Sequence, residues 1–245
     1  MATDKKKNRK NAAFSSEVNL GFDLDFFCSL SQMRSVSPLD LSTISAISRR
    51  SGTDQIVLHL RSKSEAEILK LCNGSGKTCL KIEPKPDLIS AAEKARPSSV
   101  CFVSRINGRP APMALSDSSL PAIKKAVLAF KARKISVGVS VKAEAVSLRR
   151  VRALGADFVE ICALDYAQSA GKKLKDELEQ LQLAVYLASE LDLKPWLACG
   201  INYQNARALS QIPRLFGINV GWAVAAHAIL WGLKSAVGEM KVLVA

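Results

Sequence analysis

Histidine and aromatic residues are scarce in this sequence, and long apolar runs are lacking. Aromatic residues make up 6% of the chain, and only two histidines, His59 and His227, occur. A transition-metal site is therefore not expected, because imidazole is the commonest ligand of such metals. No apolar run reaches the roughly 18 residues of a membrane span, and no signal-peptide pattern precedes the body of the chain. These absences favour a cytoplasmic protein without a membrane partner.

Cysteine is present, but not in the paired spacing of a dithiol or zinc motif. None of the six cysteines forms a Cys-x-x-Cys pair, and most lie in apolar runs typical of strands. Cysteines in such runs are usually buried and reduced, as in cytosolic proteins. The positions are Cys28, Cys72, Cys79, Cys101, Cys162 and Cys199.

Basic residues exceed acidic ones by a wide margin. The formal net charge is +13, of which the first ten residues hold +4, so +9 remains for the rest of the chain. Such a surplus favours anionic partners: phosphorylated metabolites, nucleic acid or acidic lipid. We interpret residues 1–16 as a basic, disordered tail and residues 17–245 as one domain. The tail leaves nucleic-acid binding open as an alternative.

From about residue 17 onward, short apolar runs alternate with amphipathic segments eight times. Strict alternation of strand and helix indicates a parallel sheet with right-handed crossovers, and eight units allow that sheet to close. A length of 245 residues is typical of one (β/α)₈ barrel. We therefore predict an α/β TIM barrel with one or more additional helices. The expected strands are Asn19–Asp25, Gln55–Leu60, Thr78–Glu83, Ser99–Val103, Ile135–Val139, Phe158–Cys162, Pro195–Cys199 and Leu215–Val220.

The last fifty residues contain two units in which a strand ends near a glycine and a helix follows. The glycines are Gly200 and Gly221. Two such units at the end of a barrel sequence usually form its phosphate-binding corner, because backbone N–H groups at a helix start attract anions. The apolar pattern predicts one final helix over Trp222–Val242.

Side chains at the carboxyl ends of barrel strands face the active site. Asp23 and Asp25 are two apart on the first expected strand and therefore share a face; the structural alternative is one inward acid and a helix cap. His59 and Arg61 likewise share a face on the second, which sets a base beside a guanidinium that can bind phosphate. A histidine held by structural hydrogen bonds is the alternative.

Other candidates have plainer alternatives. Glu83 and Glu160 lie near the ends of the third and sixth expected strands, where a surface or salt-bridge role is the simpler interpretation. Arg34 follows the first strand and is either a phosphate ligand or a solvated arginine. A loop rich in Pro and Gly, Asn107–Leu115, follows the fourth strand on the face where barrel enzymes place working loops.

These residues resemble the pyridoxine 5′-phosphate synthase family, and the similarity extends over nearly the whole chain. It implies a (β/α)₈ barrel with additional helices, assembled into homo-oligomers. We expect neither a metal nor another cofactor. It also implies condensation of 3-amino-2-oxopropyl phosphate with 1-deoxyxylulose 5-phosphate, which closes a pyridine ring and releases water and phosphate. The resemblance is strongest in Leu20–Asp25, Ile56–Arg61, Gly155–Ile161 and Gly217–Lys241.

The resemblance implies roles for the candidate residues. Asp25, His59 and Arg61 match contacts to deoxyxylulose phosphate, with His59 also a proton acceptor. Glu83 matches a second proton acceptor, and Glu160 matches a glutamate that stabilises the transition state.

The same resemblance assigns Arg34, Gly200 and Gly221 to the amino-ketone phosphate. Asp23 stands where the family has an asparagine, so it too matches a substrate-binding position. Lys81 likewise replaces an asparagine, two residues before Glu83.

The chain also departs from the family pattern. Cys199 stands where the family has a catalytic histidine, and Trp222 where it has a histidine after the last glycine. Phe26 replaces another histidine, and Ser62–Glu65 shortens a run that includes a phosphate-binding histidine. Asn107–Leu115 replaces a threonine-glycine substrate loop.

The change at Cys199 bears most on activity. A thiol has an unperturbed pKa of about 8.5, and burial raises it, so a cysteine is a poor substitute for imidazole in proton transfer. We therefore interpret the chain as a divergent synthase-like barrel that binds a phosphorylated small molecule but has lost or altered ring closure. An active pyridoxine 5′-phosphate synthase is the alternative. Schiff-base or nucleophilic chemistry at Lys81 or Cys199, and a scaffold or nucleic-acid role, are further alternatives.

Overall fold

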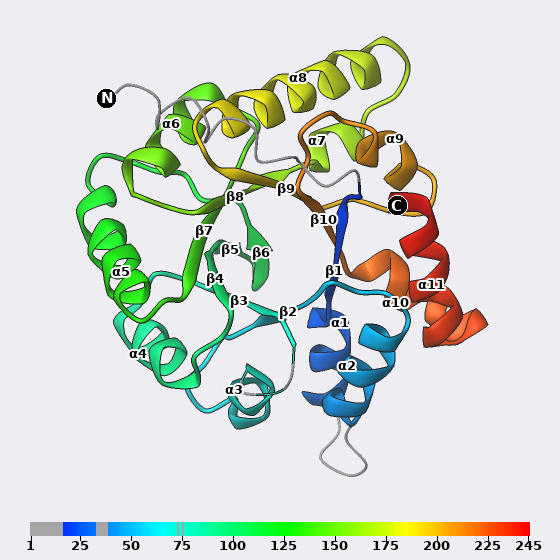
Figure 1. Cartoon of the computed structure of the whole chain (residues 1–245), viewed down its shortest axis with the longest axis horizontal. Coiled ribbons are helices and arrows are strands. Elements are labelled where there is room, and N and C mark those ends of the chain that lie inside the picture. Colours follow the sequence, from blue (N-terminus) through cyan, green and yellow to red (C-terminus); the bar gives the residue numbers. More distant parts are fainter. Residues whose placement is uncertain (1–16, 33–38, 73, 75) are drawn as a thin grey trace, which may run out of the picture.

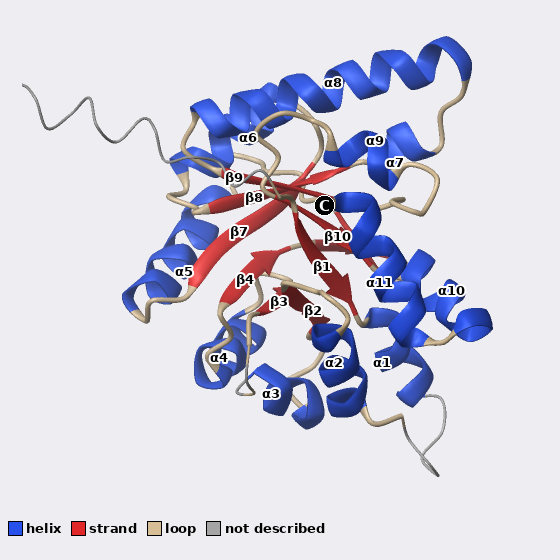
Figure 2. Ribbon diagram, turned by 45° about the vertical axis from the view of Figure 1, so that its right-hand side comes forward, coloured by secondary structure: helices blue, strands red, loops and turns tan. Residues whose placement is uncertain are grey.

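Eight parallel strands close into a barrel, and helices cover its outside (Figures 1 and 2). The computed structural model describes residues 17–32, 39–72, 74 and 76–245. The predicted TIM barrel is confirmed, and the expected strand ends are correct to within two residues. In order around the ring, the strands are β1 (Asn19–Asp23), β2 (Gln55–His59), β3 (Thr78–Ile82), β4 (Ser99–Phe102), β7 (Ser136–Val141), β8 (Phe158–Cys162), β9 (Lys194–Ala198) and β10 (Gly217–Val220).

The described part of the chain contains more helices than barrel strands, as predicted. Two of the additional helices, α1 and α7, directly follow strands β1 and β8, and a third, α10, precedes α11. The bounds are α1 (Asp25–Gln32), α2 (Leu41–Arg50), α3 (Ala66–Cys72), α4 (Pro86–Ala95), α5 (Leu120–Ala132), α6 (Ala145–Ala153), α7 (Leu164–Ala167), α8 (Gly171–Glu190), α9 (Ala206–Ser210), α10 (Trp222–Trp231) and α11 (Leu233–Val244).

Alternation along each strand sorts side chains between the barrel interior and the helix layer. On β3, Cys79 and Lys81 share one face, while Leu80 and Ile82 face the other way. An apolar cluster formed by Val57, Cys79, Cys101, Val103, Phe158 and Trp196 fills the inside. Because helices cover the outside, the strands are buried on both faces, and every residue of β2 and β3 is buried. Polar side chains inside the barrel are therefore exceptions that the structure must compensate.

Two expectations about element boundaries were wrong. The first strand ends at Asp23, and Asp25 begins α1 with its N–H donating to Asp23 Oδ1 at 3.0 Å. The two aspartates therefore do not share a strand face, and Asp23 accepts a hydrogen bond at the start of the helix. The predicted single helix over Trp222–Val242 is broken at Gly232, whose φ of 79° ends α10 and starts α11.

The loop expected over Asn107–Leu115 begins as a β-hairpin. Strands β5 (Ser104–Ile106) and β6 (Arg109–Ala111) pair antiparallel. Asn107 and Gly108 form the two-residue turn with φ of 51° and 76°. Positive φ at both turn residues is the signature of a type I′ hairpin, for which Asn-Gly is the preferred sequence. In the view down the barrel, this hairpin lies within the ring of strands (Figure 1).

Other expectations fall on the termini and the cysteines. All six cysteines are free, and Cys28, Cys72, Cys79 and Cys101 are buried. No helix among the described residues is long and apolar enough to cross a membrane. The predicted tail over residues 1–16 lies outside the described residues, so the division into tail and domain stays a prediction.

Candidate active site

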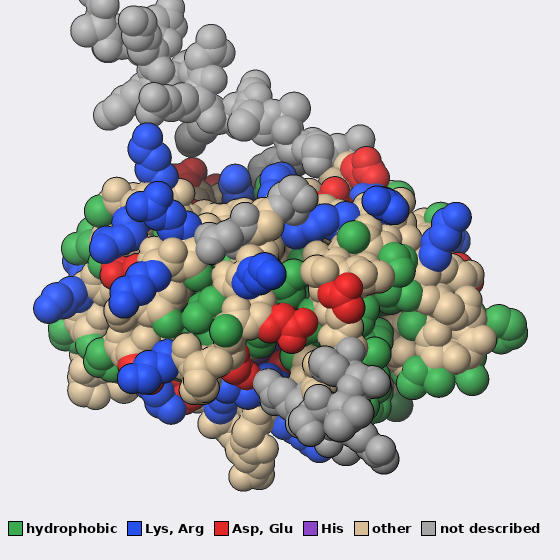
Figure 3. All heavy atoms as spheres, turned by 90° about the horizontal axis from the view of Figure 1, so that it is seen from below, with side chains coloured by type: hydrophobic (Ala, Val, Ile, Leu, Met, Phe, Trp, Pro, Cys, Tyr) green, Lys and Arg blue, Asp and Glu red, His purple; other side chains and the backbone are tan. Residues whose placement is uncertain are grey.

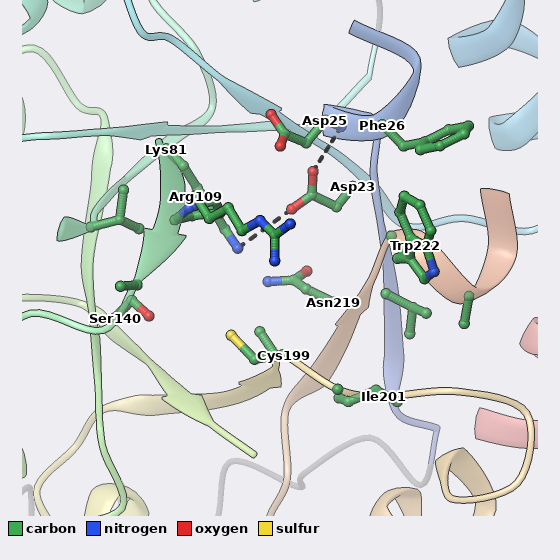
Figure 4. A pocket seen from close by; sticks show the side chains of 18 of the residues that line it. Asp23, Asp25, Phe26, Lys81, Arg109, Ser140, Cys199, Ile201, Asn219 and Trp222 are labelled. Atoms are coloured by element: carbon green, nitrogen blue, oxygen red, sulfur yellow. Dashed lines mark hydrogen bonds and ion pairs between the residues drawn. The ribbon is translucent and has the colours of Figure 1, made fainter. Parts of the chain in front are cut away.

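A cavity of about 830 Å³ opens at the carboxyl ends of the barrel strands (Figure 4). Its volume lies within the range of small-molecule sites. Residues from the ends of β1, β3, β8, β9 and β10 and from the β5–β6 hairpin line it. The candidate residues that it brings together are Asp23, Asp25, Arg61, Glu160, Cys199, Gly200, Gly221 and Trp222.

A buried charge network forms the floor of the cavity. Lys81 Nζ lies 2.9 Å from Glu160 Oε2 and 3.6 Å from Asp23 Oδ2. His59 Nε2 lies 2.8 Å from the same Asp23 oxygen. The side chains of Lys81 and Glu160 are only 5% and 2% exposed. Charges so far from water persist only when they are paired, and here each charge has a partner within the barrel.

The network shifts the pKa of its members. Burial alone would lower the pKa of Lys81, but the carboxylates of Glu160 and Asp23 raise it well above the usual value. Burial alone would raise the pKa of Asp23, but His59 and Lys81 hold it well below the ordinary range. The cavity floor therefore presents an ammonium and a carboxylate at neutral pH.

Asn219 completes the network on the side of β10. Its Nδ2 donates to Glu160 Oε2 at 2.7 Å, and its Oδ1 accepts from Gln55 Nε2 at 3.0 Å. Both the oxygen and the nitrogen of the amide therefore have a fixed partner. Glu160 is thus held by Lys81 on one side and Asn219 on the other.

His59 lies beneath the cavity and does not line it. Its side chain is fully buried, and Nδ1 faces Arg105 Nη2 at 3.5 Å. A guanidinium has only donors, so this arrangement fits a ring proton on Nε2 that is donated to Asp23. His59 reaches the cavity through Asp23, and its predicted proton-acceptor role stays a prediction.

Arg61 lies at the rim and is held by two acids. Its Nη2 donates to Asp25 Oδ1, and its backbone N–H donates to Glu65 Oε2 at 2.6 Å. The backbone N–H of Ser62 donates to the same Glu65 oxygen at 3.1 Å. The shortened run Ser62–Glu65 therefore forms a turn that fixes the guanidinium over the cavity.

The corner predicted from the two glycines lies on the wall of the cavity. Gly200 has φ of 74°, and an added Cβ would lie 2.5 Å from Ala167 Cβ. At Gly221 an added Cβ would lie 3.0 Å from Asp23 Cβ. Gly221 caps α10, whose first residues Trp222 and Ala223 also line the cavity. Their N–H groups have no partner within the helix, so this wall favours an anion.

Cys199 joins this corner to β9. Its φ of 68° is rare for a residue other than glycine and turns the chain sharply before Gly200. A hydrogen bond with Cys162, together with burial, raises the pKa of Cys199 well above its usual value. The same bond lowers the pKa of Cys162. The Cys199 thiol therefore keeps its proton near neutral pH.

Trp222 stands at the rim, beside Phe26 (Figure 4). The two ring centroids are 5.0 Å apart in an edge-to-face arrangement, and Trp222 is 71% exposed. An indole this exposed leaves the glycine corner open to a ligand.

Two candidates are not placed in the cavity. Glu83 is not among the lining residues, and its carboxylate pairs with Lys85 Nζ at 3.0 Å. Arg34 lies outside the described residues.

Sequence reasoning did not single out Asn219 and Arg109, and it considered Lys81 only for other chemistry. Lys81 and Asn219 are polar residues at inward positions of otherwise apolar strands, which was the available signal. Arg109 directly follows the Asn-Gly turn. Among the described residues, no group of three or more His, Cys, Asp or Glu side chains is arranged to hold a metal.

Comparison with known proteins gives a consistent result. A family model described as "Pyridoxal phosphate biosynthesis protein PdxJ" matches residues 20–245. A pyridoxine 5′-phosphate synthase of Elusimicrobium minutum (strain Pei191) is 28% identical over 233 residues, which cover 91% of this chain and 96% of the relative. The enzyme of the same name from Thermodesulfovibrio yellowstonii (strain ATCC 51303 / DSM 11347 / YP87) is 29% identical over 238 residues, or 93% and 97% of the two chains.

Solved structures resemble the chain in fold alone. A 3-hexulose-6-phosphate synthase superposes with a TM-score of 0.61 at 18% identity and covers 93% of this chain and 100% of its own. A phosphoribosyl anthranilate isomerase from Thermococcus kodakaraensis gives a TM-score of 0.57 at 14% identity, with 93% and 98% covered.

Proposed function

We propose, on the premise that the chain belongs to the PdxJ family of pyridoxal phosphate biosynthesis proteins, that it is a working pyridoxine 5′-phosphate synthase. The reaction condenses 3-amino-2-oxopropyl phosphate with 1-deoxyxylulose 5-phosphate, closes the pyridine ring and releases water and phosphate. One observation carries the proposal. A single cavity has the Asp23–Lys81–Glu160 charge network on its floor and the start of α10 on its wall.

The wall supports binding of a phosphorylated substrate. The N–H groups at the start of α10 and the backbone around Gly200 suit one phosphate group, because an anion there is stabilised by the helix dipole. Gly200 and Gly221 leave space where a side chain would collide with Ala167 or Asp23. The phosphate thereby anchors one substrate so that its reactive carbons extend toward the charged floor.

The floor supports the chemical steps. Addition of an amine to a carbonyl places negative charge on the carbonyl oxygen, and the Lys81 ammonium stabilises that charge in a site of low dielectric constant. Ring closure then requires groups that take and return protons. We assign this exchange to Glu160, while Asp23, whose pKa His59 and Lys81 hold well below the ordinary range, stays ionised and stabilises positive charge. The second proton-acceptor role implied for Glu83 has no support from the cavity geometry.

A two-substrate assay tests the proposal. The purified protein should form pyridoxine 5′-phosphate, and Glu160→Gln should lower kcat by about 100-fold or more, since it removes a charge from the floor. Glu190→Gln is the matched control, because Glu190 pairs with Arg214 on the outer surface. A folded wild-type protein that forms no product from the two substrates would refute the proposal.

A second candidate function is binding of the same ligands without ring closure, and Cys199 favours it. A thiol whose pKa is raised holds its proton and is unsuited to accept one near neutral pH. Under this alternative, calorimetry detects binding of 1-deoxyxylulose 5-phosphate while the assay detects no product. Appearance of activity in Cys199→His would then locate the loss at this side chain.

A further inference from the structure

Two thiols meet at the carboxyl ends of neighbouring barrel strands. In the parallel pairing of β8 with β9, Cys162 lies opposite Ala198, the residue before Cys199. The N–H of Ala163 donates to the carbonyl oxygen of Ala198 at 2.8 Å, so the pairing continues past the last residue of β8. The two cysteines are therefore held one residue out of register, on backbones that are hydrogen-bonded to each other.

The backbone at Cys199 brings its side chain toward Cys162. Side chains of a regular strand alternate between its two faces, so a continued β9 would direct Cys199 away from the face of Ala198 and Cys162. The φ of 68° at Cys199 breaks this alternation. Cys199 lines the cavity (Figure 4), and its thiol is hydrogen-bonded to the Cys162 thiol. The sharp turn thus sets two sulfur atoms side by side.

The separation of the two strands suits a disulfide. Hydrogen-bonded strands lie about 4.8 Å apart, and a disulfide joins residues whose Cα atoms are about 4.4–6.8 Å apart. A bond between the two thiols therefore fits the spacing of β8 and β9.

The other cysteines differ from this pair in burial and in acidity. Cys162 and Cys199 are partly exposed, whereas the other four are buried. Burial raises the pKa of three of these thiols to about 12 and that of the fourth well above its usual value. Buried thiols that keep their protons are inert, because the thiolate is the reactive form. The buried four are Cys28, Cys72, Cys79 and Cys101.

Within the pair, the shared hydrogen bond divides the roles. It lowers the pKa of Cys162 and raises that of Cys199, so Cys162 is the thiol that ionises more readily. A thiolate beside a second thiol is the arrangement of redox-sensitive cysteines, in which one sulfur is oxidised and the other resolves it.

We propose that Cys162 and Cys199 form a redox-sensitive pair, which hydrogen peroxide oxidises to a disulfide across the ends of β8 and β9. The Cys162 thiolate attacks the peroxide: an S–O bond forms, the O–O bond breaks, and the leaving oxygen takes a proton from solvent and departs as water. The Cys199 sulfur then attacks the sulfenic acid of Cys162. The S–S bond forms, the S–O bond breaks, and the hydroxyl leaves as water with the Cys199 proton. Two thiols are oxidised and one peroxide is reduced, with two molecules of water as products.

The disulfide would alter the wall of the cavity. Cys199 directly precedes Gly200, and both residues line the cavity. Oxidation replaces a thiol that can donate a hydrogen bond by a sulfur that cannot, and it ties the end of β9 to β8. The bond forms by the chemistry of the two thiols alone, so the inference does not depend on the proposed function.

Oxidation of the whole protein tests the inference. The reduced wild type is treated with hydrogen peroxide, digested with trypsin without a reductant and analysed by mass spectrometry. We expect a disulfide that links the peptide of Cys162 to the peptide of Cys199, while the four buried cysteines stay reduced. Dithiothreitol should return both cysteines to thiols. The variants Cys162→Ala and Cys199→Ala should each lose this product, and Cys72→Ala is the matched control, because Cys72 is a buried cysteine on α3.

The same treatment of urea-unfolded wild type shows whether the fold prepares the pair. We expect the Cys162–Cys199 link to form selectively in the folded protein and to be one of several links in the unfolded chain. Equal selectivity in both states would overturn the inference, as would thiols that remain reduced in the folded wild type. Links that join other cysteines or two copies of the chain, in place of this one, would overturn it too, and so would loss of the link in Cys72→Ala.

Discussion

Lys81 is the residue on which the charge balance of the cavity depends. It is the cation that contacts both Asp23 and Glu160, and it lies inside a barrel otherwise filled by apolar side chains. An ammonium in this position offsets the cost of burying two inward-facing carboxylates. The residue type alone did not reveal this role, because a lysine between apolar residues is equally consistent with a surface strand. Only the closure of the barrel brings β1, β3 and β8 to one point.

We predict that Lys81→Met destabilises the fold. Removing the cation leaves two buried carboxylates without compensation, a change that typically costs about 3–5 kcal/mol. Equilibrium unfolding in urea measures the difference. The control is Lys85→Met, because Lys85 is 59% exposed and its pair with Glu83 contributes at most about 1 kcal/mol. Equal unfolding free energies for the two variants would show that Lys81 does not carry the balance assigned to it.

Helix α2 shows how a single cap defines an element. The helix spans Leu41–Arg50. In the structure Asp40 is the N-cap: Oδ1 accepts from the N–H of Ser42 at 2.9 Å, and Oδ2 accepts from Thr43 Oγ1 at 2.5 Å. These bonds lower the pKa of Asp40 to about 2. The carboxylate therefore remains ionised at pH values well below the ordinary pKa of an aspartate.

We predict that Asp40→Ala lowers the melting temperature by about 2–5 °C, while Asp40→Asn retains most of the cap. Because the folded pKa of Asp40 is depressed, its contribution is fully present above the ordinary carboxyl pKa near 4. It is lost as the pH falls toward 2. Calorimetric scans between about pH 2 and pH 7 should show the gap between wild type and Asp40→Ala closing on the acidic side. A gap that is constant with pH would contradict the role of the ionised cap.

The strands show how far the residues within a strand predict where that strand begins and ends. Phe158–Cys162 was predicted with both ends correct, whereas the strand after Asn19 ended two residues earlier than expected. The apolar run past Asp23 continues into α1, and local pattern does not distinguish the two conformations. The hairpin was missed for a related reason: its strands are short and lack apolar alternation, and only the Asn-Gly pair signalled it.

At the scale of the whole molecule, the surface of α10 differs from the rest because several of its large apolar side chains are exposed. Ile229, Leu230 and Trp231 are 71%, 75% and 65% exposed. In Figure 3, several hydrophobic side chains protrude at the right and lower right of the molecule, on the side where Figure 1 places α10 and α11. Exposed apolar clusters of this kind commonly mark interaction surfaces. The homo-oligomer implied by the family resemblance stays a prediction, and this is the surface on which we expect contact between copies.

We predict that the protein is an oligomer in solution and that Leu230→Asp with Trp231→Asp lowers its mass. Charges introduced on both copies of a shared apolar surface would be desolvated and would repel each other. Size-exclusion chromatography with light scattering measures the mass. Leu183→Asp is the control, because Leu183 is 65% exposed on α8, away from α10. A monomeric wild type, or an unchanged mass in the double variant, would contradict this surface assignment.

The excess basic residues, unlike the exposed apolar side chains of α10, are not gathered on one element of the face shown in Figure 3. On the face shown in Figure 3, Lys and Arg side chains are interspersed with acidic and apolar ones. Several described arginines are paired with acids, as in Arg152 with Asp192 and Arg214 with Glu190. Residues 1–10, which hold +4 of the net charge of +13, lie outside the described residues, so the nucleic-acid alternative stays a prediction.

The sequence by itself determined the barrel, the order of its elements, the glycine corner and the family, because alternation and local motifs record which faces are buried. It also identified eight of the residues that line the cavity, since strand ends in a parallel barrel meet at one mouth. Tertiary structure alone decided the pairing. These pairings join segments far apart in the chain: Lys81 lies between two acids, His59 is buried behind Asp23, and the Cys199 thiol is hydrogen-bonded to the Cys162 thiol. Arg109 likewise reaches the cavity from the hairpin. No local pattern encodes such contacts, because the distances between those segments are set only when the eighth strand closes on the first.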